Sequence, residues 1–129
     1  MAWVETIKKT YLIAASPGSV WQALVTPKII DRWGAGPAKM NDQVGTKFSL
    51  WGGDIHGTNT EVVPNKRLIQ DWFGGDWEKP SKVTIKLTDE KGKTRVELIH
   101  TDLPEEEVKS FSSGWDDYYF GAIKELLER

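Results

Sequence analysis

The feature that most constrains this chain is a series of short alternating segments followed by one long helical stripe. Glycine and proline turns separate the segments. In the best defined one, Val83, Ile85 and Leu87 alternate with polar residues, which is typical of a strand with one buried face. Consecutive short strands usually pair with their neighbours, so the pattern predicts an antiparallel meander. The segments cover residues 46–51, 55–63, 67–73, 81–88 and 94–101.

The helical stripe occupies the end of the chain. Its apolar residues recur at steps of three and four, and they are Val108, Phe111, Trp115, Tyr118, Ala122, Ile123, Leu126 and Leu127. Either Asp102 or Pro104 precedes the helix, and the acidic residues 105–107 suit its positive N-terminal end. We expect a helix of roughly twenty residues. No other expected element is long enough to cover the apolar face of the sheet.

The N-terminal part predicts one strand and two short helices. Residues 3–13 alternate with the period of a half-buried strand. Ser16-Pro17 and Thr26-Pro27 are both helix starts, because a hydroxyl side chain caps the first turn and proline tolerates the first helical position. Gly34 follows the second short apolar face. The expected order is therefore strand, two short helices, a meander and one long helix.

Length and composition limit the function classes. The chain of 129 residues suits a single domain covering residues 1–129, and this size supports a core without disulfides or metal. It has no cysteine, which excludes thiol nucleophiles and cysteine metal sites. The net charge of −2 and the lack of long basic runs argue against nucleic acid as a partner. No signal-peptide pattern or membrane-length apolar run is present, so we expect a cytoplasmic protein without membrane contact.

Charge is distributed unevenly along the chain. Residues 102–129 contain eight acidic and three basic side chains, which leaves a formal charge of −5 on that segment. One interpretation is an acidic face for a basic partner. The other is a solvated helix surface, which many helices of globular proteins carry.

Three sequence motifs resemble a known family. They lie at residues 45–53 (GTKFSLWGG), 61–66 (EVVPNK) and 114–124 (GWDDYYFGAIK). They are similar to the C-terminal domain of the activator of heat shock protein 90 ATPase family, within the START-like (SRPBCC) superfamily. The resemblance extends from about residue 7 to residue 128. It implies an α+β helix-grip fold, in which a curved antiparallel sheet of six or seven strands wraps around a long C-terminal helix.

The resemblance leaves two functions open. In the two-domain activators, a separate N-terminal domain carries much of the ATPase stimulation, and the C-terminal domain is thought to contact the N-terminal region of the chaperone. A co-chaperone-like domain that binds a heat shock protein 90 chaperone is therefore one expectation. Related START-like proteins bind hydrophobic ligands, so a carrier or sensor of a small apolar molecule is the alternative. A shared fold does not choose between them.

Residues that could carry catalysis do not form a recognisable set. His56 and His100 are the only histidines, and no spaced ligands for a metal accompany them. Ser112-Ser113-Gly114 lacks the context of a nucleophile elbow. We therefore expect no enzyme activity, cofactor or metal. A cyclase would need His56, His100 or Tyr118 inside a pocket with a shifted pKa and a polar partner.

Aromatic residues are the better functional signal. They come from the second short helix, the sheet and the long helix, which would surround any gap between helix and sheet. A cavity lined by aromatics is a common small-molecule site, whereas a filled core is the alternative. The expected lining residues are Trp33, Phe48, His56, Trp72, His100, Phe111, Trp115 and Tyr118. Trp51 and Trp77 fall in or beside loops, where they would anchor a protein partner or cap the sheet edge.

Overall fold

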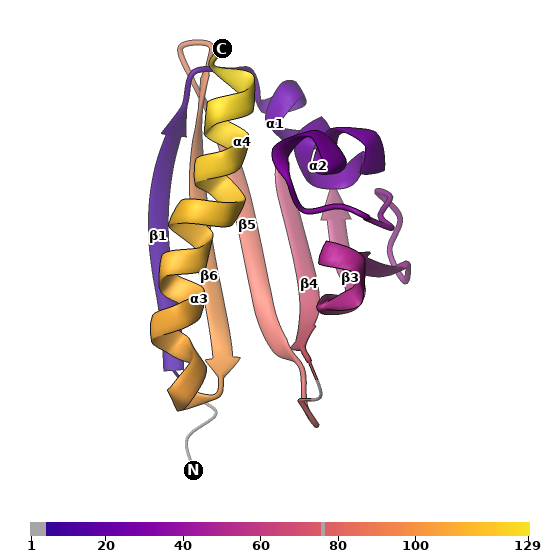
Figure 1. The fold of residues 1–129 in the computed structure, drawn as a ribbon. Helices are drawn as coiled ribbons and strands as arrows, with labels where there is room; N and C mark the ends of the chain where they lie inside the picture. Colours follow the sequence, from indigo (N-terminus) through magenta and orange to yellow (C-terminus); the bar gives the residue numbers. More distant parts are fainter. Residues whose placement is uncertain (1–4, 76) are drawn as a thin grey trace.

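In the computed structural model, which describes residues 5–75 and 77–129, the chain forms a six-stranded antiparallel sheet that holds a long C-terminal helix (Figure 1). The strand order is β1-β6-β5-β4-β3-β2, so the last strand lies beside the first. The predicted meander and helix-grip architecture are confirmed. The strands are β1 (Glu5–Ile13), β2 (Lys47–Leu50), β3 (Ile55–Val63), β4 (Arg67–Gly74), β5 (Ser81–Glu90) and β6 (Lys93–Leu103).

The register of the strands follows the predicted alternation. Ile85 of β5 pairs with Leu98 of β6, and both side chains are buried on the face that meets the helix. The first strand is described from Glu5, so the predicted positions 3 and 4 lie outside the described residues. Strand β6 continues to Leu103, two residues beyond the prediction, because its pairing with β1 persists to Glu5.

Two short helices follow β1 as expected, namely α1 (Pro17–Val25) and α2 (Pro27–Trp33). The Ser16 hydroxyl accepts a hydrogen bond from the Ser19 amide at 3.2 Å, which is the predicted cap. Gly34 ends α2 with a φ of 107°, a left-handed conformation that glycine adopts without steric cost. In Figure 1 the two helices lie beside α4, in front of the part of the sheet that contains β4 and β3.

The C-terminal helix is long but not a plain α-helix. It begins with the turn η2 (Glu105–Glu107) and continues as α3 (Val108–Gly114), the π turn η3 (Trp115–Tyr119) and α4 (Phe120–Leu127). The Phe120 amide donates to the Trp115 carbonyl, five residues back, which is the hydrogen bond of a π turn. A π turn adds one residue to a helical turn. The sequence positions that occupy the buried face are therefore shifted by one residue from this point on.

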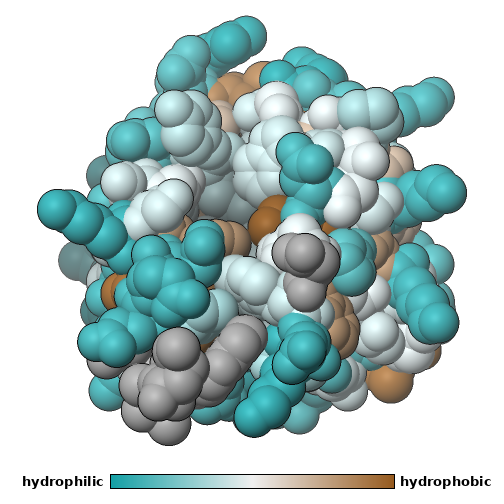
Figure 2. All heavy atoms as spheres, turned by 60° about the horizontal axis from the view of Figure 1, so that its bottom comes forward, coloured by the Kyte–Doolittle hydropathy of each residue, from teal (hydrophilic) through white to brown (hydrophobic). Residues whose placement is uncertain are grey.

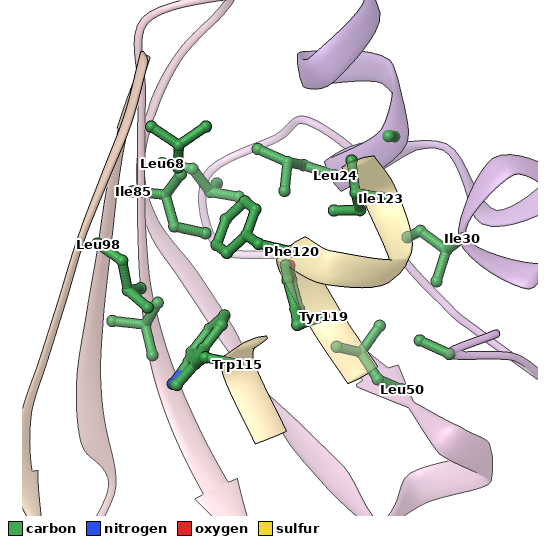
Figure 3. Close-up of a cluster of buried hydrophobic side chains, with 14 of the residues drawn as sticks. Leu24, Ile30, Leu50, Leu68, Ile85, Leu98, Trp115, Tyr119, Phe120 and Ile123 are labelled. Atoms are coloured by element: carbon green, nitrogen blue, oxygen red, sulfur yellow. The ribbon is translucent and has the colours of Figure 1, made fainter. Parts of the chain in front are cut away.

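This extra residue corrects one part of the predicted stripe. Tyr118 was expected on the buried face, but its side chain is 68% exposed, whereas Tyr119 is 2% exposed. Phe120 and Ile123 complete the buried face. Figure 3 shows Phe120 pointing towards Leu68 and Ile85 of the sheet, while Tyr119 lies nearer Leu50.

The interior is filled over most of its length, as the alternative interpretation of the aromatics expected. The buried residues of the sheet, α1, α2 and the C-terminal helix form one cluster (Figure 3). Among residues 5–75 and 77–129, no helix combines the length and the apolar character needed to cross a bilayer.

Candidate functional site

A pocket of about 300 Å³ lies where α3 and η3 face the start of β3 and the end of β4. Figure 2 brings this lower end of Figure 1 forward, and it shows a hollow with pale and brown surface near the centre of the face and teal groups around it. Most of the wall is aromatic. The lining residues are Trp51, Asp54, Ile55, Trp72, Ser110, Phe111, Gly114, Trp115, Tyr118 and Tyr119.

Stacked aromatic rings form the inner wall of the pocket. Trp72 of β4 stacks on Trp115 of η3, with ring centroids 4.9 Å apart and an interplanar angle of 25°. Tyr119 lies 4.6 Å from Trp115 on one side and 4.8 Å from Trp33 of α2 on the other. Such contacts between rings add to the free energy gained from burial alone. The wall is therefore a rigid surface supplied by sheet and helix together.

The π turn that supplies Trp115 and Tyr119 depends on a glycine. A Cβ atom built on Gly121 would lie 1.9 Å from the Asp116 carbonyl oxygen, which is far inside van der Waals contact. Glycine therefore permits the backbone to close around η3. Gly114 behaves differently, because no atom lies within 4 Å of a Cβ at that position. A close backbone approach therefore requires glycine at Gly121, whereas Gly114 lines the open pocket.

His100 is fully buried behind this wall. It belongs to a chain of hydrogen bonds in which each group accepts from one neighbour and donates to the next. Trp115 donates its indole N–H to His100 Nδ1 at 3.1 Å, so the imidazole proton is on Nε2. Nε2 then donates to Ser81 Oγ at 2.8 Å, and the Ser81 hydroxyl donates to the Trp72 carbonyl at 3.0 Å. Burial lowers the pKa of His100 to about 3, so the ring is neutral. Both ring nitrogens are occupied, and His100 positions Trp115.

A second buried network holds Trp72, and the sequence analysis missed it. The Trp72 indole N–H donates to Gln70 Oε1 at 2.8 Å, and Gln70 Nε2 donates to Asn59 Oδ1 at 2.8 Å. Asn59 in turn donates to the Asn41 carbonyl at 2.9 Å. Gln70 shares the parity of Leu68 and Trp72 in its strand, so alternation would have placed it inward. This network fixes the position of Trp72 in the wall.

The outer side of η3 is attached to β1. Asp116 accepts hydrogen bonds from Lys9 Nζ and from the Tyr11 hydroxyl, both at 2.8 Å. The hydrogen bond from Lys9 lowers the pKa of Asp116, and burial raises the pKa of Tyr11 above its ordinary value. These contacts hold the π turn against the sheet on the side away from the pocket.

Four of the eight expected cavity residues line the pocket, namely Trp72, Phe111, Trp115 and Tyr118. Trp33 and Phe48 are buried in the adjoining core, and His100 lies one layer behind the wall. The prediction for His56 is wrong, because this side chain points to the opposite face of the sheet and stacks on Phe73 at 5.3 Å. One residue of register separates it from Ile55, which does line the pocket.

The two tryptophans expected to bind a partner are both half-buried. Trp51 lines the pocket and meets Trp33 edge to face at 6.5 Å. Trp77 packs on Phe111, with centroids 5.3 Å apart. A role for Trp51 and Trp77 in partner binding stays a prediction. Within the described ranges, no three His, Asp or Glu side chains lie together so that they could hold a metal ion.

The fold and the site together define a class of protein: a START-like helix-grip domain with an aromatic pocket between helix and sheet. The chain belongs to the family described as activator of Hsp90 ATPase homolog 1-like protein, whose model matches residues 14–128.

Curated relatives carry related names. The human activator of 90 kDa heat shock protein ATPase homolog 1 is 30% identical over 124 residues, covering 95% of this chain and 36% of that protein. The Dictyostelium discoideum homolog is 29% identical over 123 residues, covering 93% of this chain and 32% of that protein. The chain therefore spans about a third of the length of the curated relatives it matches.

Solved structures support the fold. The crystal structure of an HSP90 activator from Plasmodium falciparum has a TM-score of 0.88 at 23% identity, covering 95% of this chain and 96% of that one. The solution structure of the Aha1 dimer from Colwellia psychrerythraea has a TM-score of 0.84 at 22% identity, covering 96% of each chain. At these identities the likeness shows a shared fold only.

Proposed function

We propose that this chain is a non-catalytic binding domain that docks on a chaperone of the heat shock protein 90 class in the cytoplasm. The observation that carries the proposal is Tyr118, a large side chain that is 68% exposed at the edge of an aromatic pocket. Exposed aromatics beside a concave apolar wall are typical of the residues that dominate protein interfaces. Family membership supports the class of partner, since relatives are named as activators of the 90 kDa heat shock protein ATPase.

The chemistry of the pocket supports binding over catalysis. A general acid or base needs a side chain that can exchange a proton next to a bound substrate. His100 has both ring nitrogens in hydrogen bonds, and its depressed pKa keeps it neutral. Asp54 is the only charged residue among those that line the pocket. A single carboxylate without a second charged group in the lining favours recognition of a ligand over acid–base catalysis.

The proposal concerns binding and not stimulation of the chaperone's ATPase. The matched region is about a third of each curated relative, so the activity in their names belongs to much longer proteins. A domain that only docks would bind the chaperone without changing its turnover. Affinity and ATPase rate are therefore measured separately.

The direct test is isothermal titration of this chain against the heat shock protein 90 chaperone from the same organism, with and without ATP. We expect binding by the unmodified chain and a loss of at least about tenfold for Tyr118→Ala, the scale of an interface hot spot. Val44→Ser is the matched control, because Val44 is 63% exposed and does not line the pocket. The proposal fails if the unmodified chain does not bind, or if both variants lose affinity equally.

A small ligand is the second candidate function, and the pocket volume favours it. About 300 Å³ is at the lower end of the range of roughly 300–1,000 Å³ found for ligand sites. A carrier purified under gentle conditions would retain its ligand. Native mass spectrometry of the intact protein should then show a bound mass that disappears on denaturation. A single unliganded mass, together with no thermal shift across a library of small ligands, would contradict this candidate.

A further inference from the structure

We infer that the pocket receives an organic cation, an ammonium or guanidinium group carried on an apolar stem. This inference rests on the proposed function, in which the aromatic pocket is part of the binding site, and it names the chemistry of the group bound there. Its basis is the combination of aromatic rings and one carboxylate in a single wall. The group comes either from a small molecule or from a side chain of the docked partner.

The pocket lining includes one carboxylate residue, Asp54. Asp54 follows the tight turn Trp51–Gly53 and lines the pocket at the start of β3. Its backbone is held in place, because the Asp54 amide donates to the Trp51 carbonyl and its own carbonyl accepts from Gly75. Within residues 5–75 and 77–129, no ion pair or hydrogen bond joins the Asp54 carboxylate to another side chain. The negative charge is therefore available to a guest.

Aromatic rings make up most of the pocket lining. Six of the ten lining residues are aromatic, and three of those six are tryptophan. The face of an indole, phenol or phenyl ring attracts a cation through its quadrupole, and indole attracts most strongly. When a cation loses its hydration shell in such a pocket, the attraction of the rings offsets part of the lost hydration energy. A neutral apolar group of the same shape gains only burial.

The described lining also lacks cationic side chains that would hold an anion. No lysine or arginine lines the pocket. His100, the histidine behind the wall, is neutral because burial depresses its pKa. The indole N–H groups of Trp72 and Trp115 already donate to Gln70 and His100, so neither is free for a phosphate or carboxylate. An anion in this pocket would meet no positive charge to offset its desolvation, and the Asp54 carboxylate would repel it.

The surrounding charge points the same way. Six of the ten lining residues come from residues 102–129, a segment with a formal charge of −5. Asp117, which precedes Tyr118 in the chain, is exposed. Acidic groups around a concave site raise the local concentration of cations and repel anions.

The test compares three probes of one shape and different charge: choline, its neutral isostere 3,3-dimethylbutan-1-ol and the anion 3,3-dimethylbutanoate. Binding to the full chain is followed by tryptophan fluorescence and by chemical shifts of the indole N–H groups. We expect choline to bind at least about tenfold more tightly than the neutral isostere, with the anion weakest. Raising the salt concentration should weaken choline and leave the isostere unchanged.

Two variants locate the effect. Asp54→Asn should weaken choline by about tenfold and leave the isostere unchanged, and Tyr118→Ala should weaken choline more than the isostere. Glu125→Gln is the matched control, since this exposed carboxylate on α4 does not line the pocket and pairs with Arg129. Circular dichroism confirms that each variant folds. Losses that are equal for Asp54→Asn and Glu125→Gln would overturn the inference.

Competition with the chaperone assigns the source of the cation. If saturating choline displaces the partner, the partner supplies the cationic side chain, and if both bind together, the guest is a small molecule. Either result, with the charge preference intact, supports the inference. Equal binding of choline and its isostere overturns the inference, and it shows that the pocket binds an apolar group without regard to charge. If no probe binds but the chaperone still does, the inference is overturned. The pocket is then not part of the docking surface, and the proposed docking on the chaperone stands.

Discussion

The indole N–H of Trp115 donates to Nδ1 of His100 across 3.1 Å, and this single bond joins the C-terminal helix to the last strand of the sheet. Because the donor is an indole, the acceptor nitrogen must be unprotonated. The helix wall of the pocket is therefore coupled to the protonation state of a buried histidine. The same bond is the reason to read His100 as a positioning residue and not as a catalyst.

Stability should depend on pH through His100. Its pKa falls from 6.5 in the unfolded chain to about 3 in the fold, so between these values the unfolded chain binds a proton that the folded chain does not. The free energy of unfolding should fall by up to about 1.4 kcal/mol per pH unit as pH is lowered from 6.5 towards 3. Urea unfolding at pH 6.5, 5.5 and 4.5 measures it.

The variant His100→Gln isolates this effect. The pKa values of Asp116 and Glu128 are also lowered, so these carboxylates add a loss of stability near the acid end of the window, but the unmodified chain and His100→Gln share that contribution. We expect His100→Gln to be less stable at neutral pH and to show a shallower pH slope. Identical slopes for the two proteins would show that His100 does not cause the dependence.

Gln70 should contribute more to stability than any surface glutamine. Gln70→Ala leaves the Trp72 indole N–H and the side-chain oxygen Oδ1 of Asn59 buried without their partner. Unsatisfied buried groups cost about 1–3 kcal/mol each, so we expect a loss of about 2–4 kcal/mol in chemical unfolding. Gln43→Ala is the control, because Gln43 is exposed and should change stability by less than about 0.5 kcal/mol. Equal losses would contradict the buried network.

The two helical glycines should respond in opposite directions. Gly121→Ala places a Cβ against the Asp116 carbonyl oxygen and should destabilise the fold by at least about 2 kcal/mol, since the π turn must open. Gly114→Ala meets open space and should stabilise the helix by about 1 kcal/mol. Thermal unfolding of both variants checks this, and a stabilised Gly121→Ala would show that the π turn is not required.

The contact between η3 and β1 should contribute little to stability. Lys9 and Asp116 are 2.8 Å apart, but the Asp116 side chain is 49% exposed, so solvent screens the pair. A double-mutant cycle of Lys9→Met and Asp116→Asn should give a coupling below about 1 kcal/mol that shrinks in high salt. A larger coupling that resists salt would show that the pair is shielded from solvent.

Much of the fold followed from local patterns. The alternation of Val83, Ile85 and Leu87 and the cap at Ser16 depend on neighbours in the chain, so the sequence expresses them directly. The exchange of Tyr118 for Tyr119 did not follow, because the predicted stripe assumed the steps of three and four of an α-helix, whereas the π turn introduces a step of five. Gly121 permits this turn, because a Cβ there would clash with the Asp116 carbonyl, but the apolar pattern does not show that contact.

Only part of the site could be predicted from the sequence, for a similar reason. Composition and parity were enough to place Trp72, Phe111 and Trp115 at the wall. They did not place Asp54 there or His56 on the outer face, because one residue of strand register decides which side a group faces. That register depends on pairing with β4, which lies beyond a turn.

The amino-acid sequence alone determined the order and type of the elements and the family, since caps, turns and periodicity are local properties and motifs are linear. Tertiary structure decided three further matters: that the interior is filled except at one end, that His100 is neutral and held by Trp115, and that Asp54 lines a pocket whose wall is mostly aromatic. Each depends on groups far apart in the chain, whose distances and desolvation exist only after the helix has packed on the sheet.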